Sequence, residues 1–340
     1  MLWPERPDNW RREAQPAQAA FTNVATAISR FEPVTMGVSA AHFDTARAQL
    51  PARIRVVELS HDDAWMRDVG PTGVINDAGE LRGIDWPFNA WGGFVGGLYA
   101  PWDLDDHVAR KVLELEGAAR YRAPLVNEGG AIHVDGEGTA LVTEQCLLNR
   151  NRNPGLTQVQ IERHLKAYLG ATSVLWLGAG VFDDETDGHI DNLACFVRPG
   201  RVCLTWCDDP RDPQHAISRD ALERLMAVRD ARGRRLQVHK LPAPGPLYMT
   251  ARELSGIHKK RGTRHRVAGG RLAGSYVNFY LANGALIMPL LDPRTDRAAA
   301  RVLKGLFPRR KVVGVQAREI LLGGGGIHCI TQQVPRRLRS

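Results

Sequence analysis

The sequence predicts an α/β protein in which five similar modules, each made of a helix, a strand and a β-hairpin, form a ring. Pairs of apolar strands recur around short glycine-containing turns, and segments with helical periodicity separate these pairs. One helix and one hairpin cannot bury their own apolar face, so neighbouring modules must cover each other. An open doubly wound sheet is the competing arrangement, but it does not explain two consecutive hairpin strands in each module.

Four hairpins are predicted because their turns contain residues that tolerate positive φ. They cover residues 74–81, 132–142, 193–204 and 277–288. A fifth and shorter apolar segment, 327–334, follows a run of four glycines.

Helical periodicity predicts helices between these hairpins, and a short β-branched run follows most of them. The helices are expected at 17–31, 105–116, 157–169, 216–229 and 295–307, and the following strands at 34–38, 173–177, 236–241 and 311–315. Thr157 and Gln160 have the spacing of a capping box, which supports a helix start at this point.

Composition narrows the class of protein. The chain has 340 residues, a formal net charge of +8 and 44% apolar residues, which excludes disorder for most of it. Its basic runs, 232–235, 259–266 and 336–339, contain no aromatic residues, so we expect solvated surface and no nucleic-acid partner. No linker divides the sequence, so one domain over 1–340 is expected.

The expected environment is the cytoplasm. No apolar run is long enough to span a membrane, and the first residues carry charge where a signal peptide needs an apolar segment. The five cysteines form no paired Cys-x-x-Cys motif, which predicts free thiols in a reducing compartment.

Reactive side chains fall at one position of the repeat, just before or at the start of the first hairpin strand. This position holds residues 65–68, 127–130 and 187–192 in the first three hairpin modules, and residues 326–329 in the last. If the modules surround an axis, these positions meet there. The shared central site would contain Asp68, Glu128, His189, Asp191 and Cys329.

Such a site suits a cationic substrate. A thiol beside an imidazole is an activated nucleophile, but three carboxylates raise the pKa of a thiol and oppose its ionisation. A guanidinium resolves the conflict, because its charge and paired N–H donors match carboxylates. Attack of Cys329 on the guanidinium carbon, with His189 moving protons, would release ammonia and leave a thiouronium that water hydrolyses to a urea.

Structural roles are the alternative for several of these residues. Buried packing is expected for the other cysteines, Cys146, Cys195, Cys203 and Cys207, and structural roles for His133 and His328. His189 and Asp191 alternate around Ile190, so they would share one face of a strand, where a core histidine is the competing interpretation. A metal site of Glu128, His189, Asp191 and Cys329 is chemically possible, but no compact ligand spacing supports it.

The same segments resemble a known family. AWMRDVGPT (64–72), NEGGAIHVDGEGTALVTEQCLLNRNRNPGLT (127–157), DDETDGHIDNLACFVRPGRV (183–202) and GGGGIHCITQQVP (323–335) are similar to agmatine deiminases of the guanidine-modifying pentein superfamily. The resemblance spans nearly the whole chain. It implies a five-bladed α/β propeller that hydrolyses agmatine to N-carbamoylputrescine and ammonia without a metal or organic cofactor. It also implies a homo-oligomer, a dimer or a tetramer.

Residue roles follow from this resemblance. It implies Cys329 as the nucleophile, with His189 and Glu128 as its proton-handling partners. Asp68 and Asp191 would hold the guanidinium, and Trp65 would form part of the pocket wall. For the distal ammonium of agmatine we expect an acidic group from residues 183–185, with Glu185 the preferred one. A deiminase or amidinotransferase for another guanidine, such as free or peptidyl arginine, is the alternative within the class, and a non-catalytic binding protein is the alternative outside it.

The sequence departs from the family pattern at three places. Gly326 and Asp187 stand where members usually have asparagine, so Gly326 loses a polar contact and Asp187 is expected to raise the pKa of His189 slightly. Members usually have a longer lead-in strand before the segment that begins at Met1. The expected closure of the first module depends on that strand.

Overall fold

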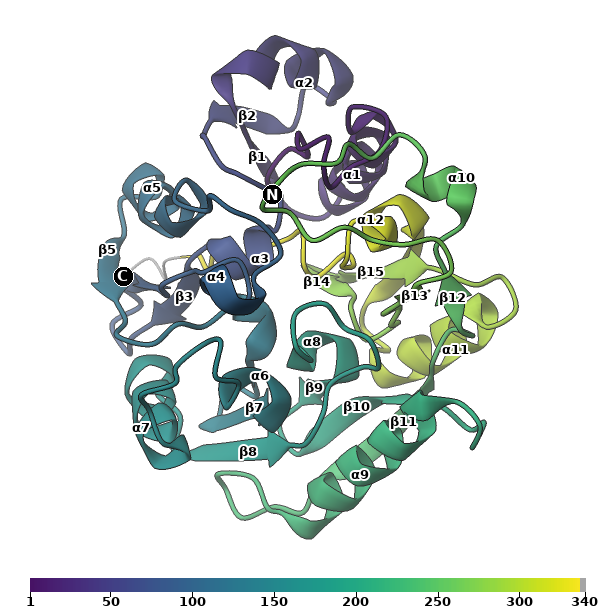
Figure 1. The fold of residues 1–340 in the computed structure, drawn as a ribbon. Coiled ribbons are helices and arrows are strands. Elements are labelled where there is room, and N and C mark those ends of the chain that lie inside the picture. Colours follow the sequence, from purple (N-terminus) through teal and green to yellow (C-terminus); the bar gives the residue numbers. More distant parts are fainter. Residues whose placement is uncertain (337–340) are drawn as a thin grey trace.

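A computed structural model describes residues 1–336, in which the modules surround a common centre (Figure 1). Among these residues, no helix is both long enough and apolar enough to cross a membrane. The last four residues, which include most of the basic tail, lie outside the described part of the chain.

Each of four modules contains its own three-stranded sheet. In each, the first two strands form an antiparallel hairpin and the second pairs in parallel with the third. The sheets are β3 (Thr72–Ile75), β4 (Leu81–Asp85) and β5 (Ala119–Arg122); β6 (His133–Val134), β7 (Thr139–Thr143) and β8 (Ser173–Leu177); β9 (Ala194–Arg198), β10 (Arg201–Trp206) and β11 (Gln237–Pro242); and β14 (Tyr280–Ala282), β15 (Ala285–Leu290) and β16 (Lys311–Gln316). All four predicted hairpins are confirmed.

A helix connects the second strand to the third in each of these modules, because parallel neighbours need a crossover. These helices are α5 (Val108–Leu115), α7 (Gln158–Leu169), α9 (Pro213–Ala227) and α11 (Asp296–Leu306), and they lie on the outside of the ring (Figure 1). The capping box predicted at Thr157 is formed. Helix α9 begins three residues before its predicted start, because Asp212 caps it and Pro213 occupies its first turn.

The first module differs from the others. It contains α1 (Gln15–Ile28), β1 (Thr35–Val38), α2 (Phe43–Gln49) and β2 (Arg55–Glu58), and its two named strands are parallel. Leu2 adds an isolated parallel bridge to Gly37. A second two-stranded sheet, β12 (Leu247–Tyr248) with β13 (Arg271–Leu272), flanks α10 (Ala251–Leu254).

Neighbouring modules share their apolar faces. Helix α9, for example, contributes Ala221 and Leu225 to a buried cluster that also contains Leu204 of its own β10 and Leu175 of the preceding β8. Helix α9 is therefore held by two sheets, and burial of such surface stabilises the fold by about 25 cal/mol per Å² of apolar area.

The residues of the predicted central site that come from the first three hairpin modules lie in single helical turns or directly before them. Helix α3 (Met66–Val69), the 3-10 turn η3 (Gly129–Ala131) and α8 (Ile190–Leu193) come directly before the first strands of their modules, as the repeat predicted. The predicted strand around Ile190 is wrong, since α8 begins there. The apolar segment 327–334 contains no strand, and its backbone contacts another module through the Arg67 N–H, which donates to the Cys329 carbonyl. The remaining helices are α4 (Gly93–Gly96), α6 (Glu144–Leu147) and α12 (Arg318–Leu322), with 3-10 turns η1 (Ala40–His42) and η2 (Asp105–His107).

Candidate active site

Cys329 lies in the turn that follows α12 and the glycine run, with only 5% of the residue exposed. Its Sγ donates to Asp191 Oδ2 at 3.6 Å, and Asn278 Nδ2 donates to Sγ at 3.2 Å. Burial, with the charges of Asp191 and Asp68, raises the pKa of the Cys329 thiol well above its usual value of 9.0. The free protein therefore holds a neutral thiol that needs added positive charge to ionise.

Three of the predicted residues surround Gly130. A Cβ at this glycine would lie 2.5 Å from His189 Nδ1, 2.8 Å from Asp68 Oδ1 and 3.2 Å from Asp191 Oδ2, so only glycine allows them to converge. Its N–H donates to Asp68 Oδ1 at 2.9 Å, and Trp91 Nε1 donates to Asp68 Oδ2 at 3.0 Å. Burial, reinforced by neighbouring carboxylates, raises the pKa of Asp68 to about 6.

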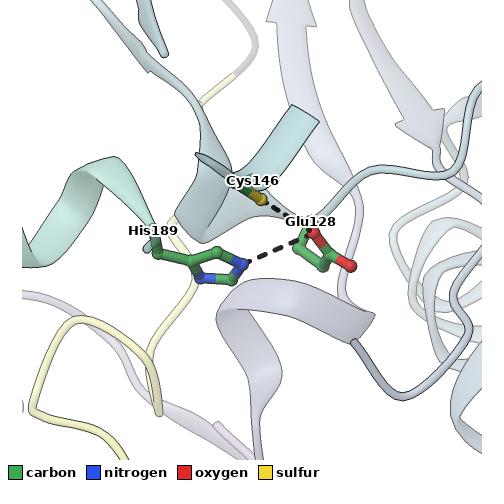
Figure 2. Close-up of side chains that lie close together, drawn as sticks. All are labelled: Glu128, Cys146 and His189. Carbon is green, nitrogen blue, oxygen red and sulfur yellow. Dashed lines mark hydrogen bonds and ion pairs between the residues drawn. The ribbon is translucent and has the colours of Figure 1, made fainter. Parts of the chain in front are cut away.

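His189 and Glu128 face each other beside a second thiol, Cys146 (Figure 2). His189 Nε2 lies 3.4 Å from Glu128 Oε2, and Cys146 Sγ lies 3.9 Å from the same oxygen. The prediction that Cys146 is only a packing residue is therefore incomplete. Burial lowers the pKa of His189, but Asp68, Cys146 and Glu128 together raise it well above 6.5, which favours the imidazolium.

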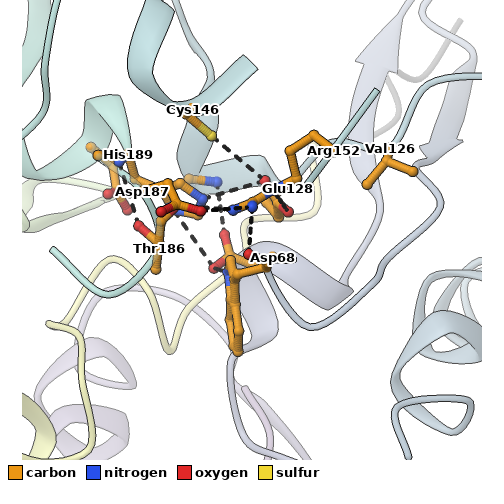
Figure 3. A network of polar contacts seen from close by, with 12 residues as sticks. Asp68, Val126, Glu128, Cys146, Arg152, Thr186, Asp187 and His189 are labelled. Carbon is orange, nitrogen blue, oxygen red and sulfur yellow. Dashed lines mark hydrogen bonds and ion pairs between the residues drawn. The ribbon is translucent and has the colours of Figure 1, made fainter. Parts of the chain in front are cut away.

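Arg152 organises the other side of Glu128, as the polar network shows (Figure 3). Its Nε donates to Glu128 Oε1 at 2.8 Å, and its Nη1 donates to Asp187 Oδ2 at 3.0 Å. Burial raises the pKa of Glu128, but Arg152 and His189 outweigh it and lower that pKa below its usual 4.5. Asp68, Cys146 and Glu128 account for the main rise in the pKa of His189, while the carboxylate of Asp187 pairs with Arg152.

Asp191 has one occupied and one free oxygen. His328 Nδ1 donates to Oδ2 at 2.8 Å, while Oδ1 has no hydrogen-bond partner in the described part of the chain. Burial and the charge of Arg67 lower the pKa of His328 well below 6.5, so the imidazole is neutral. Arg67 itself donates to the His328 carbonyl and to Gln333 Oε1.

A cavity opens beside Cys329 and Asp68, and Trp65 and Trp91 form part of its wall. A Cβ on Gly325 would lie 2.6 Å from Trp65 Cζ3 and 3.1 Å from Cys329 Sγ, which shows how closely the indole approaches the sulfur. Trp65 and Cys329 therefore line the same cavity.

Glu185 also lines this cavity, but its carboxylate is already paired. Arg266 donates to it from Nε at 3.0 Å and from Nη2 at 2.6 Å, and Arg266 bonds the Gly323 carbonyl as well. The prediction that the basic run 259–266 is solvated surface is therefore wrong for Arg266, whose side chain is 13% exposed.

Asn278 and Arg152 were not identified from the sequence. Asn278 is 1% exposed, and its Oδ1 accepts from the His328 N–H at 2.9 Å while Nδ2 donates to Asn192 Oδ1 at 3.0 Å. The repeat contained the necessary signal: Asn278 precedes β14 just as the other central residues precede their first strands. No comparable signal marks Arg152, which follows α6 in a loop.

The chain matches the family of Porphyromonas-type peptidyl-arginine deiminases over residues 1–335. It is 58% identical over 337 residues to an agmatine deiminase of Pseudomonas aeruginosa, covering 98% of this chain and 92% of the relative. It is 57% identical over 342 residues to an agmatine deiminase of Pseudomonas syringae, covering 100% of this chain and 93% of the relative.

A solved structure gives the same result. The agmatine deiminase of Enterococcus faecalis superposes with a TM-score of 0.96 at 48% identity, covering 99% of this chain and 93% of that one. Its mixed α/β fold is therefore the fold of this chain. By its match over residues 1–335 and its full-length relatives, the chain belongs to the agmatine deiminase family of the guanidine-modifying pentein superfamily.

Proposed function

We propose that this protein hydrolyses agmatine to N-carbamoylputrescine and ammonia through a covalent thiouronium on Cys329. The observation that carries the proposal is the buried thiol itself, which has Asp191 Oδ2 at 3.6 Å and lies beside a cavity that Asp68 also lines. Two carboxylates next to a nucleophile favour a substrate that is permanently cationic and planar. The names of the relatives above point to the same substrate.

Asp68 and Asp191 would hold the guanidinium. The free Oδ1 of Asp191 is a buried acceptor with an unmet hydrogen bond, which a guanidinium N–H would satisfy. His328 fixes the other oxygen and so orients the carboxylate. The substrate charge would offset the repulsion that keeps the Cys329 thiol neutral, and the thiol proton would pass to a neighbouring acceptor such as Asp191.

The thiolate would then attack the guanidinium carbon and form a tetrahedral species. The protonated His189 would give its proton to the departing nitrogen, and ammonia would leave. The resulting neutral imidazole would take a proton from water as water attacks the thiouronium. The C–S bond would then break, and the released thiolate would regain its proton from Asp191. The hydroxyl proton of the tetrahedral species would pass to solvent, where it protonates the released ammonia, as the ureido product forms. Glu128, held by Arg152, would orient the imidazole and stabilise its charged form.

Asn278 would support the sulfur through its 3.2 Å contact. We expect Asn278→Ala to lower kcat about 10- to 100-fold, because a hydrogen bond to a charged group contributes about 1.5–3 kcal/mol. Steady-state ammonia release measures the effect, and Asn283→Ala, in the exposed turn after β14, is the matched control. An unchanged kcat in Asn278→Ala would show that the contact does not help the thiolate.

Glu185, which lines the cavity, is proposed to bind the distal ammonium alongside its ion pair with Arg266. We expect Glu185→Gln to raise KM for agmatine about tenfold with a smaller change in kcat. Butylguanidine, which lacks that ammonium, separates this role from loss of the ion pair. If both substrates lose affinity equally, Glu185 only positions Arg266.

No step above needs a metal ion or organic cofactor. Incubation with a chelator, followed by removal of the chelator, is therefore expected to leave kcat unchanged. A lasting loss of activity that added metal restores would contradict the mechanism.

A comparison of substrates tests the function itself. Formation of ureido product and ammonia should be much faster with agmatine than with free or peptidyl arginine; preference for arginine would favour the alternative deiminase. No ammonia from any guanidine, together with salt-dependent binding of DNA or RNA, would favour a non-catalytic protein on the same scaffold.

We also propose the number of blades, the cellular location and the assembly of the protein. The arrangement of the sheets around one centre supports a single-domain, five-bladed propeller over 1–340, with the first module as the fifth blade. A cytoplasmic homo-oligomer, a dimer or tetramer, without a nucleic-acid or membrane partner, completes the proposal, and light scattering would measure its assembly.

A further inference from the structure

Three buried donor atoms from different segments lie together beside the nucleophile without including it (Figure 2). Glu128 is the residue before η3, Cys146 lies in α6, and His189 is the residue before α8. Their nearest ligand atoms all lie within 4.8 Å of one another, and each residue is at most 1% exposed. The proposed reaction uses Glu128 and His189 but gives Cys146 no role.

The spacing is close to that of a tetrahedral zinc site. Zinc bonds of about 2.0 Å to N or O and about 2.3 Å to S place donor atoms roughly 3.3–3.6 Å apart. The separation between His189 Nε2 and Glu128 Oε2 is already 3.4 Å, and that between Cys146 Sγ and Oε2 is 3.9 Å. All three donor atoms lie within 4.8 Å of one another, so side-chain adjustments of up to about an ångström would complete the geometry.

The surrounding residues also match what a zinc site needs. Asp68 Oδ2 lies 3.8 Å from the remaining ring nitrogen of His189, and closing this gap would give the carboxylate–imidazole pair that orients metal-binding histidines. Arg152 holds the other oxygen of Glu128, which leaves Oε2 directed at the group. The carboxylates of Asp68 and Asp187 add negative charge that balances Arg152.

We infer that Glu128, Cys146 and His189 form an inhibitory binding site for Zn²⁺, separate from the sulfur of Cys329. The thiol and imidazole donors favour Zn²⁺ over Mg²⁺ and Ca²⁺, which prefer oxygen ligands. A bound ion occupies His189 Nε2 and Glu128 Oε2, so it removes the imidazole from proton transfer. The inhibitory effect rests on the proposed function, but binding of the ion does not.

Direct binding is tested with Co²⁺, which reports thiolate ligation by an absorption band in the near ultraviolet. The full-length Cys329→Ser variant removes the nucleophile, so a band in this variant must come from another cysteine. We expect the band in Cys329→Ser, its loss in Cys329→Ser/Cys146→Ser, and its retention in Cys329→Ser/Cys207→Ser, which lacks a partly exposed thiol instead. No band in Cys329→Ser, or a band that survives loss of Cys146, overturns the site.

Inhibition is tested by the Zn²⁺ concentration that halves the rate, with each variant compared with its own zinc-free rate. We expect Cys146→Ala to raise this concentration at least about tenfold, and Cys207→Ala to leave it unchanged. If Cys146→Ala and the parent protein are half-inhibited at the same Zn²⁺ concentration, the inhibitory zinc binds elsewhere, for example at Cys329, and the inference is overturned. Cys146→Ser replaces Cys146→Ala if the cavity prevents folding, and the cobalt band decides binding even if no guanidine is hydrolysed.

Discussion

Replacement of Cys329 by serine is expected to abolish agmatine turnover, by at least about 10³-fold in kcat, while agmatine still binds. A serine hydroxyl nearly matches the thiol in size, but it is a far weaker nucleophile unless a strong base removes its proton. The carboxylates of Asp68 and Asp191, which would hold the guanidinium, are unchanged by the substitution. Ammonia release measures turnover, and calorimetry on the variant measures binding.

The matched control is Cys207→Ser, which changes a thiol on the third hairpin module and should retain full activity. Substantial turnover by Cys329→Ser would eliminate it as the nucleophile. A haloacetamidine that mimics the guanidine adds an independent measurement, because mass spectrometry should locate its adduct on residue 329 and find none in the serine variant.

Asp68→Asn is expected to weaken guanidinium binding by about 2 kcal/mol or more, which is about a 30-fold increase in Kd. Asp68 accepts from the Trp91 indole on one oxygen and from the Gly130 N–H on the other. An asparagine amide therefore turns a donor toward one of these donors, in addition to losing the charge that a guanidinium needs.

Binding is best measured by calorimetry in the Cys329→Ser background, where no chemistry follows. Asp77→Asn is the control, since Asp77 lies in the exposed turn between β3 and β4 of the same module. Circular dichroism checks that Asp68→Asn folds. An agmatine affinity equal to that of Asp77→Asn in a folded protein would remove Asp68 from the binding site.

Local sequence patterns predicted most of the elements. Turns such as Asn283-Gly284 and caps such as Thr157 act within a few residues, so hairpins and helix starts were readable without the fold. The error at Ile190 arose because alternation around one residue has the same appearance in a strand and in the single helical turn of α8.

The site was partly predictable for a related reason. Repetition placed Asp68, Glu128, His189 and Asp191 at one position of their modules, and the glycine run marked Cys329. Asn278 occupies the same position, but the predicted start of its hairpin at residue 277 hid it. Arg152 has no position in the repeat, so only its ion pair with Glu128 identifies it.

The modules, the residue types available to each, and the family could be read from the chain alone, because these depend on neighbours along the sequence. Which polar groups meet depends on how the modules pack: Glu185 pairs with Arg266, Asp187 pairs with Arg152, and Cys146 lies beside Glu128. These contacts join residues from 18 to 81 positions apart. Their strength depends on distance and burial, and the packing of one module on the next sets both.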